Sequence, residues 1–202
     1  MSKIAAFIEF DKEINRKILN DKKKVKKLFG DQFYLNHPVH LTLFAINIKK
    51  ISDLKKIYKK EKKTSKIKFS NIILNKPGIF INDPLTNGHT IYYNIKKNTK
   101  ISSIQMKHLK KINKNINVLK KNFKIFKDKV LKKNYLKYGF PFTNKIWIPH
   151  TTVASIKGIN ENNKYIKKFL KQKIMMRCKF NKISFYKIEK NKHKFLFNSE
   201  NI

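Results

Sequence analysis

Two four-residue stretches of this sequence share the pattern His-x-Thr-apolar: His-Leu-Thr-Leu at residues 40–43 and His-Thr-Thr-Val at residues 150–153. On a β-strand, residues i and i+2 lie on one face, so each stretch would put an imidazole beside a hydroxyl. An imidazole acts as an acid or a base near neutral pH, and a hydroxyl donates a hydrogen bond to a phosphate oxygen. Two such faces brought together would carry enough groups to move two protons and hold a phosphate.

A single match of this kind is more simply explained by packing, with the histidine bonded to a neighbouring side chain or to the backbone. The recurrence among only six histidines, each time within an apolar strand-like stretch, favours a catalytic interpretation of the pair. Neither motif has a His-x-His or His/carboxylate cluster around it, so we expect no metal and no cofactor. His37 is expected to face away from His40, and the remaining histidines have no motif context and are expected to be structural or exposed: His89, His108 and His193.

The elements that would position these residues follow from apolar periodicity and from turn residues. The first half of the chain predicts strand 3–10, helix 11–29, motif strand 38–48, helix 51–61, and strands 66–74 and 78–82 on either side of a Lys-Pro-Gly turn at residues 76–78. The second half predicts strand 89–95, helix 100–121, motif strand 146–156, helix 160–171, and a strand pair at 174–188 and 193–198. Both halves read strand, helix, motif strand, helix, strand, strand. We therefore expect a single two-lobed domain over residues 1–202, with sequence halves of about 1–85 and 86–202.

Residues 122–145 interrupt this repeat with aromatic side chains set among lysines. One interpretation is an aromatic, basic flap that stacks bases and contacts phosphates. The other, which we favour for most of the aromatic residues, is a helix and loop that pack on the core. The residues concerned are Phe123, Phe126, Tyr135, Tyr138, Phe140 and Phe142.

The charge balance is extreme, with 49 basic residues against 12 acidic ones and a formal net charge of +37. Such a surplus attracts polyanions, and RNA is the natural candidate, although a diffuse solvated coat of lysines is the alternative. The one cysteine, Cys178, permits no disulfide within the chain and is expected to fill the core. No stretch approaches the length of a membrane span. We expect a cytoplasmic protein, a monomer, with RNA or a nucleotide as its substrate and no membrane partner.

With one motif in each half of a chain of this length, the sequence resembles the two-histidine (2H) phosphoesterase superfamily, and within it the bacterial 2′-5′ RNA ligase-like cyclic phosphodiesterases. The Trp-Ile-Pro-His stretch at residues 147–150 is similar to the aromatic-x-Pro-His sequence that often precedes the second motif of that family. Two departures are the scarcity of arginine, which appears only at Arg16 and Arg177, and the polar Thr151 where the family often has an apolar residue.

The resemblance implies an α+β fold of two pseudo-symmetric lobes, each a mostly antiparallel sheet with helices packed on its outer face, flanking a central active-site groove. It implies that His40 and His150 are catalytic and that Thr42 and Thr152 bind the phosphate. The reaction would be metal-independent hydrolysis of a 2′,3′-cyclic phosphate to a 2′-phosphate, with His40 protonating the leaving 3′ oxygen and His150 activating water. Run backward with an RNA 5′-hydroxyl, the same chemistry is 2′-5′ ligation.

The residues alone do not assign which histidine is the acid, and two alternatives to this function stay open. One is a non-catalytic basic RNA-binding protein that retains the fold. The other is a 2H enzyme that acts on a small nucleotide, such as cyclic ADP-ribose phosphate or a 2′-5′ oligoadenylate. The paired motifs favour an enzyme, because a protein that only binds RNA needs neither both histidines nor both threonines.

Overall fold

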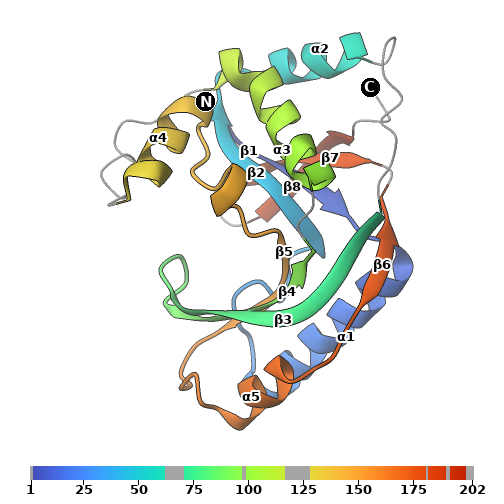
Figure 1. Cartoon of the computed structure of the whole chain (residues 1–202), viewed down its shortest axis with the longest axis vertical. Coiled ribbons are helices and arrows are strands. Elements are labelled where there is room, and N and C mark those ends of the chain that lie inside the picture. Colours follow the sequence, from blue (N-terminus) through green and yellow to red (C-terminus); the bar gives the residue numbers. More distant parts are fainter. Residues whose placement is uncertain are drawn as a thin grey trace.

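The computed structural model of the protein describes residues 2–61, 71–96, 99–116, 128–180, 182–189 and 192–198. These residues form strands and helices whose arrangement is drawn in Figure 1. In chain order the elements are β1 (Ser2–Glu9), α1 (Lys12–Phe29), β2 (His40–Ile48), α2 (Ile51–Glu61), β3 (Asn71–Asp83), β4 (Gly88–Ile95), α3 (Thr99–Ile112), the 3-10 helix η1 (Asn113–Asn115), α4 (Lys129–Tyr138), the 3-10 helix η3 (Asn144–Ile146), β5 (His150–Ile156), α5 (Lys164–Leu170), β6 (Met176–Lys179), β7 (Ile183–Glu189) and β8 (Lys192–Asn198).

The described strands form two sheets of four strands each. The first sheet has the order β2-β1-β7-β8 and the second has the order β5-β4-β3-β6, and each neighbouring pair is antiparallel. The two orders correspond strand by strand, with a motif strand at one edge and its antiparallel partner next to it. The expected α+β class with two mostly antiparallel sheets is therefore confirmed.

The two halves of the sequence exchange strands between the sheets. The β7–β8 pair from the end of the chain completes the sheet that β1 and β2 begin, while β3 from the first half pairs with β4 in the second sheet. Neither half of the sequence therefore builds a sheet on its own. The order strand, helix, motif strand, helix, strand does recur along the chain, with α4 added in the second half and β7 and β8 following it, but each sheet combines strands from both halves.

Residues 71–83 form one continuous strand, so the expected pair of strands split by a turn at residues 76–78 is wrong. Pro77 pairs with Tyr93 of β4 within an irregular stretch of the register that begins after Leu74. On its other side, β3 pairs with β6 only from Asn71 to Leu74. Proline is tolerated there because β3 has a neighbouring strand on one side only at Pro77. The backbone N–H that proline lacks is therefore not needed to pair with a strand on the open side.

Residues 174–188 do not form one strand, as the apolar pattern had predicted. Met176–Lys179 form β6 in the second sheet, and Ile183–Glu189 form β7 in the first. Only β7 pairs with the following strand, β8. The apolar pattern continues from β6 into β7, so it does not indicate that the chain passes from one sheet to the other between them.

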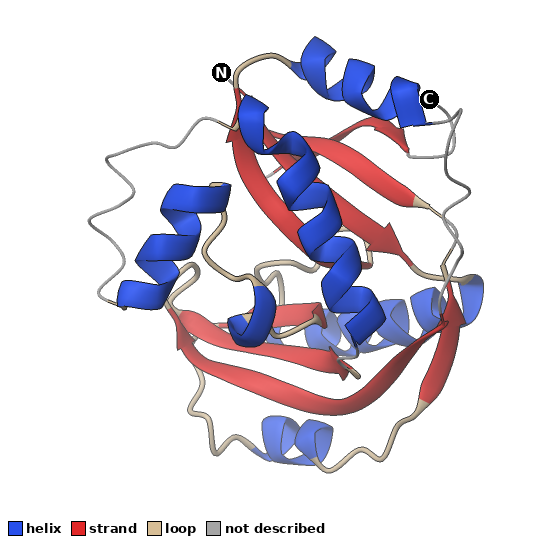
Figure 2. Cartoon of the chain, turned by 45° about the horizontal axis from the view of Figure 1, so that its top comes forward, coloured by secondary structure: helices blue, strands red, loops and turns tan. Residues whose placement is uncertain are grey.

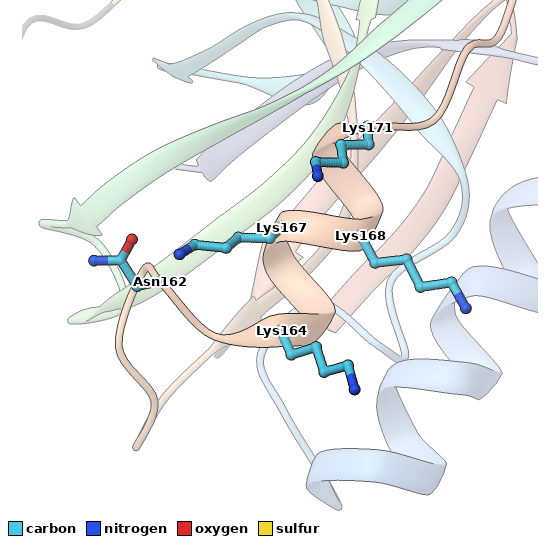
Figure 3. A pocket seen from close by; sticks show the side chains of 5 residues that line it. All are labelled: Asn162, Lys164, Lys167, Lys168 and Lys171. Atoms are coloured by element: carbon cyan, nitrogen blue, oxygen red, sulfur yellow. The ribbon is translucent and has the colours of Figure 1, made fainter.

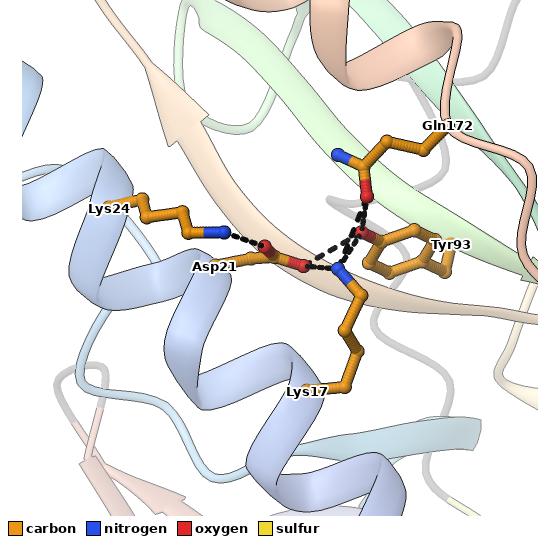
Figure 4. Close-up of polar contacts among 5 residues, drawn as sticks. All are labelled: Lys17, Asp21, Lys24, Tyr93 and Gln172. Carbon is orange, nitrogen blue, oxygen red and sulfur yellow. Dashed lines mark hydrogen bonds and ion pairs between the residues drawn. The ribbon is translucent and has the colours of Figure 1, made fainter.

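In the second sheet, the helices cover the face opposite the motif side chains. Tyr93 and Tyr92 are adjacent on β4 and therefore point to opposite faces. Tyr93 is fully buried toward α1, where its hydroxyl donates to the Asp21 carboxylate at 2.7 Å, as Figure 4 shows. The ring of Tyr92 lies instead on the side of His150, with the ring centroids 5.0 Å apart.

The first sheet has the same arrangement. Phe185 and Tyr186 are adjacent on β7, and Phe185 packs on Tyr58 of α2 with ring centroids 4.7 Å apart. Tyr186 faces the other way, toward Phe7 at 5.2 Å. Figures 1 and 2 show α2 and α3 beside the first sheet and α1 and α5 beside the second. The expectation that helices pack on the outer faces is confirmed.

Local signals explain where α1 begins and ends. The side chain of Asp11 accepts a hydrogen bond from the backbone N–H of Ile14 at 3.1 Å and caps the first turn. Gly30 ends the helix with a φ of 69°, which glycine adopts at little cost. Apolar side chains from both sheets and from the helices then merge into one core cluster, which also contains the thiol of Cys178.

Within residues 128–145, the packing interpretation of the aromatic side chains is correct for most of the described ones. Tyr135 and Tyr138 of α4 are buried, and Phe140 packs against the core. Phe142 is 46% exposed. Phe123 and Phe126 lie outside the described residues, as do residues 117–121 of the helix expected at 100–121.

Candidate functional site

The two motif strands are edge strands of different sheets, and they lie against each other. Cα atoms of β2 and β5 approach within 8 Å. The loop before β2 is also joined to β5, because the backbone N–H of Ser155 donates to the carbonyl oxygen of Phe33 at 3.0 Å. The fold therefore brings together the strands that carry the His-x-Thr-apolar stretches, although they are far apart in the sequence.

The first motif occupies the start of β2, and its side chains alternate between two environments. His40 and Thr42 are partly exposed, whereas Leu41 and Leu43 are buried. After Thr42, which pairs with Phe7 of β1, the register shifts by one residue. This bulge leaves Leu43 without an opposite residue on β1 and ends the alternation immediately after the motif.

The second motif repeats this arrangement at the start of β5. His150 and Thr152 are partly exposed, and Thr151 and Val153 are fully buried. Thr152 pairs with Tyr92 of β4, and a register shift follows it as well. In both sheets, then, a bulge follows the motif threonine, and an aromatic residue of the neighbouring strand lies opposite that threonine.

Each motif imidazole is held by a backbone carbonyl two residues earlier in the chain. Nδ1 of His40 lies 2.6 Å from the oxygen of Pro38, and Nδ1 of His150 lies 2.7 Å from the oxygen of Ile148. A carbonyl oxygen only accepts hydrogen bonds, so Nδ1 must carry the proton in both rings. In the neutral imidazole, Nε2 is then the atom with the free lone pair, and this is the atom available to exchange protons.

Aromatic rings support both imidazoles. Phe7 stacks on His40, with the ring centroids 3.7 Å apart and the planes inclined by 23°. His150 lies 5.0 Å from Tyr92 and 5.2 Å from Phe80, and these two rings stack on each other at 4.3 Å. Gly78 of β3 leaves room for the Tyr92 ring, because a Cβ at that position would lie 2.6 Å from a ring carbon of Tyr92.

Burial lowers the pKa of both motif histidines. The pKa of His40 falls to about 3, because of desolvation and the nearby cationic or imidazole groups of His193, His37 and Lys22; its bond to the Pro38 carbonyl acts in the opposite direction. Desolvation lowers the pKa of His150 too, opposed by the bond to Ile148 and by the charge of Asp83. In the free protein both rings are therefore neutral at neutral pH.

A buried amide links the first motif to the approach to the second. Gln105 of α3 is fully buried, and its Nε2 donates to the carbonyl oxygen of Leu43 at 2.8 Å and to that of Phe142 at 3.0 Å. Leu43 is the bulged residue of β2, and Phe142 lies in the segment that leads to β5. Sequence reasoning missed this residue, because a single glutamine inside a helix gives no signal of its contacts.

Two histidines that the sequence had not assigned to the site lie beside His40. The ring of His193, on β8, is 5.9 Å from that of His40 and 4.4 Å from that of His37. His37 also helps to lower the pKa of His40, so the expectation that it faces away from His40 is wrong, because the loop before β2 is not an extended strand there. His89 and His108 are buried structural residues, bonded to the backbone of Asn82 and to the hydroxyl of Tyr58, respectively.

Other features of the described residues do not add to this site. Within them, no group of three or more His, Cys, Asp or Glu side chains could hold a metal ion. Burial raises the pKa of the Cys178 thiol to about 12, which makes it a poor nucleophile. A surface depression of about 520 Å³ on α5 is lined by lysines and Asn162, and Figure 3 shows no acid or base of the motif type among them. No described helix is long and apolar enough to cross a membrane.

Comparison with known proteins identifies the fold but not a sequence family. No family model matches the sequence, and no curated protein matches it. The structure is similar to that of TT0787 of Thermus thermophilus, with a TM-score of 0.61 and 12% identity over 97% of this chain and 96% of that one. LigT of E. coli in its apo form has a TM-score of 0.56 and 9% identity over 98% of this chain and 95% of that one, and it has also been solved with NADP⁺. A phosphoesterase matches with a TM-score of 0.53 and 8% identity, over 98% of this chain and 96% of that one. The chain thus shares the fold of these proteins.

Proposed function

We propose that this protein is a 2H-type phosphoesterase that hydrolyses 2′,3′-cyclic phosphates, at an RNA end or on a nucleotide, to 2′-phosphates. The observation that carries the proposal is the duplicated arrangement of the motifs. On each of two adjoining edge strands, an imidazole is fixed with Nε2 free and a threonine follows it on the same face. The shared fold of LigT and of a phosphoesterase supports the same conclusion.

In the proposed reaction a water molecule attacks phosphorus and the bond between phosphorus and the 3′ oxygen breaks. One imidazole takes a proton from the water through Nε2, and the other gives a proton from Nε2 to the leaving oxygen. By the family resemblance, His150 is the base and His40 the acid. The negative charge of the bound phosphate raises the pKa of both rings, and this permits one of them to be protonated in the complex.

Thr42 and Thr152 are proposed to donate hydrogen bonds to the non-bridging phosphate oxygens. Both lie on the same strand face as their histidine and are partly exposed. Hydroxyl donors at these positions would stabilise the charge that develops on phosphorus oxygens in the transition state. The chemistry requires no metal, and the reverse reaction with an RNA 5′-hydroxyl is 2′-5′ ligation.

The proposal is tested by incubating the protein with adenosine 2′,3′-cyclic phosphate and with an RNA that ends in a cyclic phosphate, each in the presence of EDTA. We expect hydrolysis of at least one substrate, with the product phosphate on the 2′ oxygen as read by nuclease sensitivity and mass. Tight RNA binding without any turnover would instead support the non-catalytic alternative, which the net charge of +37 favours. Loss of turnover in EDTA, restored by a divalent ion, would replace the mechanism by a metal-assisted one.

A further inference from the structure

The imidazole cluster formed by His37, His40 and His193 extends the candidate site beyond the two motifs. Its members come from three places: the loop before β2, the first residue of β2, and β8. The rings of His37 and His193 are 4.4 Å apart and almost perpendicular, and that of His193 is 5.9 Å from His40 and 5.5 Å from Phe7. β8 is the edge of the first sheet opposite β2, so the cluster extends from His40 away from the second motif.

A buried lysine lies beneath this cluster. The side chain of Lys22, on α1, is buried, and its Nζ donates to the carbonyl oxygens of Tyr34 at 2.5 Å and His37 at 2.8 Å. Among the described residues, Lys22 forms no ion pair with a carboxylate. Tyr34 has a φ of 71°, a left-handed conformation that a residue other than glycine adopts only where its surroundings hold it. The loop that carries His37 is thus built around this ammonium group.

The groups that face the cluster leave it short of negative charge. Glu9 pairs with His40 across β1 and β2, but its carboxylate accepts from the Tyr186 hydroxyl at 2.8 Å and lies 3.7 Å from Lys182. Among the described residues, the other polar side chains beside the three rings are Tyr34, Tyr186 and Lys22, none of which is an anion at neutral pH. Three imidazoles and an ammonium therefore share one region, and no carboxylate is among the groups that shift the pKa of these rings.

In the free protein these three imidazole rings are uncharged at neutral pH. Desolvation, together with His193 and Lys22, lowers the pKa of His37 to about 4, and desolvation and Lys22 lower that of His193. An anion that entered would reverse this effect, because it would accept hydrogen bonds from the ring N–H groups and raise the pKa of each ring. Both rings are only half-buried, so a ligand can reach them.

We propose that His37 and His193 form a second phosphate subsite, which binds the phosphate on the 5′ side of the reacting nucleotide. The proposal rests on the proposed function, since it places the cyclic phosphate at His40 and His150 and the preceding phosphate on the far side of His40. A phosphate fits the cluster because its oxygens can accept hydrogen bonds from the ring N–H groups. Its negative charge would also stabilise the protonated form of these imidazoles. The site would then select polynucleotide ends, or 5′-phosphorylated nucleotides, over plain cyclic nucleotides.

The test compares adenosine 2′,3′-cyclic phosphate with the same compound carrying a 5′-phosphate. The pair differs by the phosphate alone, so base stacking contributes equally to both. We expect kcat/KM to be about tenfold or more higher for the 5′-phosphorylated compound, since a hydrogen bond to a charged group is lost when the phosphate is absent. His193→Phe and His37→Phe keep an aromatic ring but remove the donors, and each should lower kcat/KM for the 5′-phosphorylated compound by a larger factor than for the plain compound.

Lys194→Gln is the matched control, because it removes a full charge from the residue next to His193 on β8, on the opposite face of the strand. It should keep the preference. Equal turnover of the two compounds by the wild type, or an equal loss on both compounds in His193→Phe and His37→Phe, would overturn the proposal and leave the cluster as support for His40.

A binding measurement separates this proposal from the proposed function. Calorimetry with adenosine 2′,5′-bisphosphate and with adenosine 2′-monophosphate reports on the second phosphate without any turnover. Tighter binding of the bisphosphate that is lost in His193→Phe supports the subsite even if no cyclic phosphate is hydrolysed. Equal affinities in the wild type would reject the subsite even if hydrolysis is found.

Discussion

The backbone carbonyls of Pro38 and Ile148 fix the proton chemistry of the two motif histidines. Each accepts from Nδ1 of an imidazole, so both rings present the same nitrogen, Nε2, for reaction. The same contact limits ring rotation, because turning the ring about its bond to Cβ would break the hydrogen bond. A pair of imidazoles with matched tautomers and different neighbours can divide the roles of acid and base without any further residue.

The pH dependence of activity should reflect the lowered pKa values of these rings. Catalytic efficiency, kcat/KM, reports on the free protein, in which one ring must be neutral and the other protonated. Because burial lowers the pKa of His40 to about 3 and also lowers that of His150, the protonated ring is lost as pH rises, and the optimum of kcat/KM should lie below pH ~6.5. In the complex the phosphate raises both pKa values, so the optimum of kcat should lie at higher pH.

Initial rates across pH 4–9 with a cyclic nucleotide, fitted separately for kcat and kcat/KM, check this expectation on the wild-type protein. The limbs of the resulting pH profile describe the coupled pair of rings rather than single residues. An optimum of kcat/KM at higher pH than that of kcat would contradict the proposed effect of the phosphate.

Neighbouring threonines in the second motif should respond in opposite ways to replacement by valine. The hydroxyl of Thr151 is buried and has no hydrogen-bond partner among the described residues. Thr151→Val should therefore raise the free energy of unfolding, by about 1 kcal/mol, and leave activity unchanged. Thr152→Val removes a proposed phosphate donor and should lower kcat by about 10²-fold with little change in stability. Denaturant titration and initial rates measure both, and a destabilised Thr151→Val or a fully active Thr152→Val would count against the assignment of the two faces.

At the scale of elements, the sequence was sufficient for local structure but not for the way strands combine. Helix α2 has the expected bounds, and the motif strands and α1 differ from expectation by one or two residues, or four at the start of β5, because strand alternation, Asp11 and Gly30 are local signals. A turn was predicted at Pro77 because a strand accepts a proline only where it lacks a neighbour on one side. That information lies in the pairing with β6, more than ninety residues later in the chain.

The candidate site shows the same division between local and distant information. The spacing of the motifs predicted that His40 shares a strand face with Thr42, and His150 with Thr152. The resemblance to the 2H superfamily then supplied the roles expected of these residues. The ring of His193 reaches His40 only because β8 joins the first sheet, and His37 lies beside His193 because Lys22 holds the loop. No spacing in the sequence encodes either contact.

Gln105 should couple the stability of the protein to its activity. Gln105→Met keeps the length of the side chain but leaves the carbonyl oxygens of Leu43 and Phe142 buried without their donor. We expect the free energy of unfolding to fall by about 2 kcal/mol and turnover per folded molecule to fall as well, because the first motif ends at Leu43.

Gln172→Met provides the comparison, since the side-chain oxygen of Gln172 accepts from Lys17 at 3.1 Å and lies 2.9 Å from the Tyr93 hydroxyl on the helix-covered face of the second sheet, as drawn in Figure 4. It should cost stability but not turnover per folded molecule. Equal turnover in the two variants, measured below their melting temperatures, would show that Gln105 has no part in positioning the first motif.

Over the whole molecule, the excess of basic over acidic residues should govern how a polymer substrate is captured. Lysines such as those of α5, shown in Figure 3, line an exposed surface that offers charge but no catalytic group. Each phosphate of a single strand that is neutralised contributes a slope of about −0.7 in log affinity against log salt. RNA should therefore bind with a slope of several units, and a mononucleotide with a slope of about one. Equal slopes, measured by titration between low and moderate salt, would mean that the lysines take no part in binding and would favour a small nucleotide as the substrate.

The central claim is that two histidines from two different sheets perform one reaction, and a single-turnover assay tests it most directly. Wild type, His40→Ala and His150→Ala, each checked by circular dichroism for an intact fold, are mixed in excess over an RNA that ends in a 2′,3′-cyclic phosphate. Each variant should cleave more slowly than wild type by about 10²–10⁴-fold, because each loses one proton transfer. A folded variant of either histidine that cleaves at the wild-type rate would contradict the account.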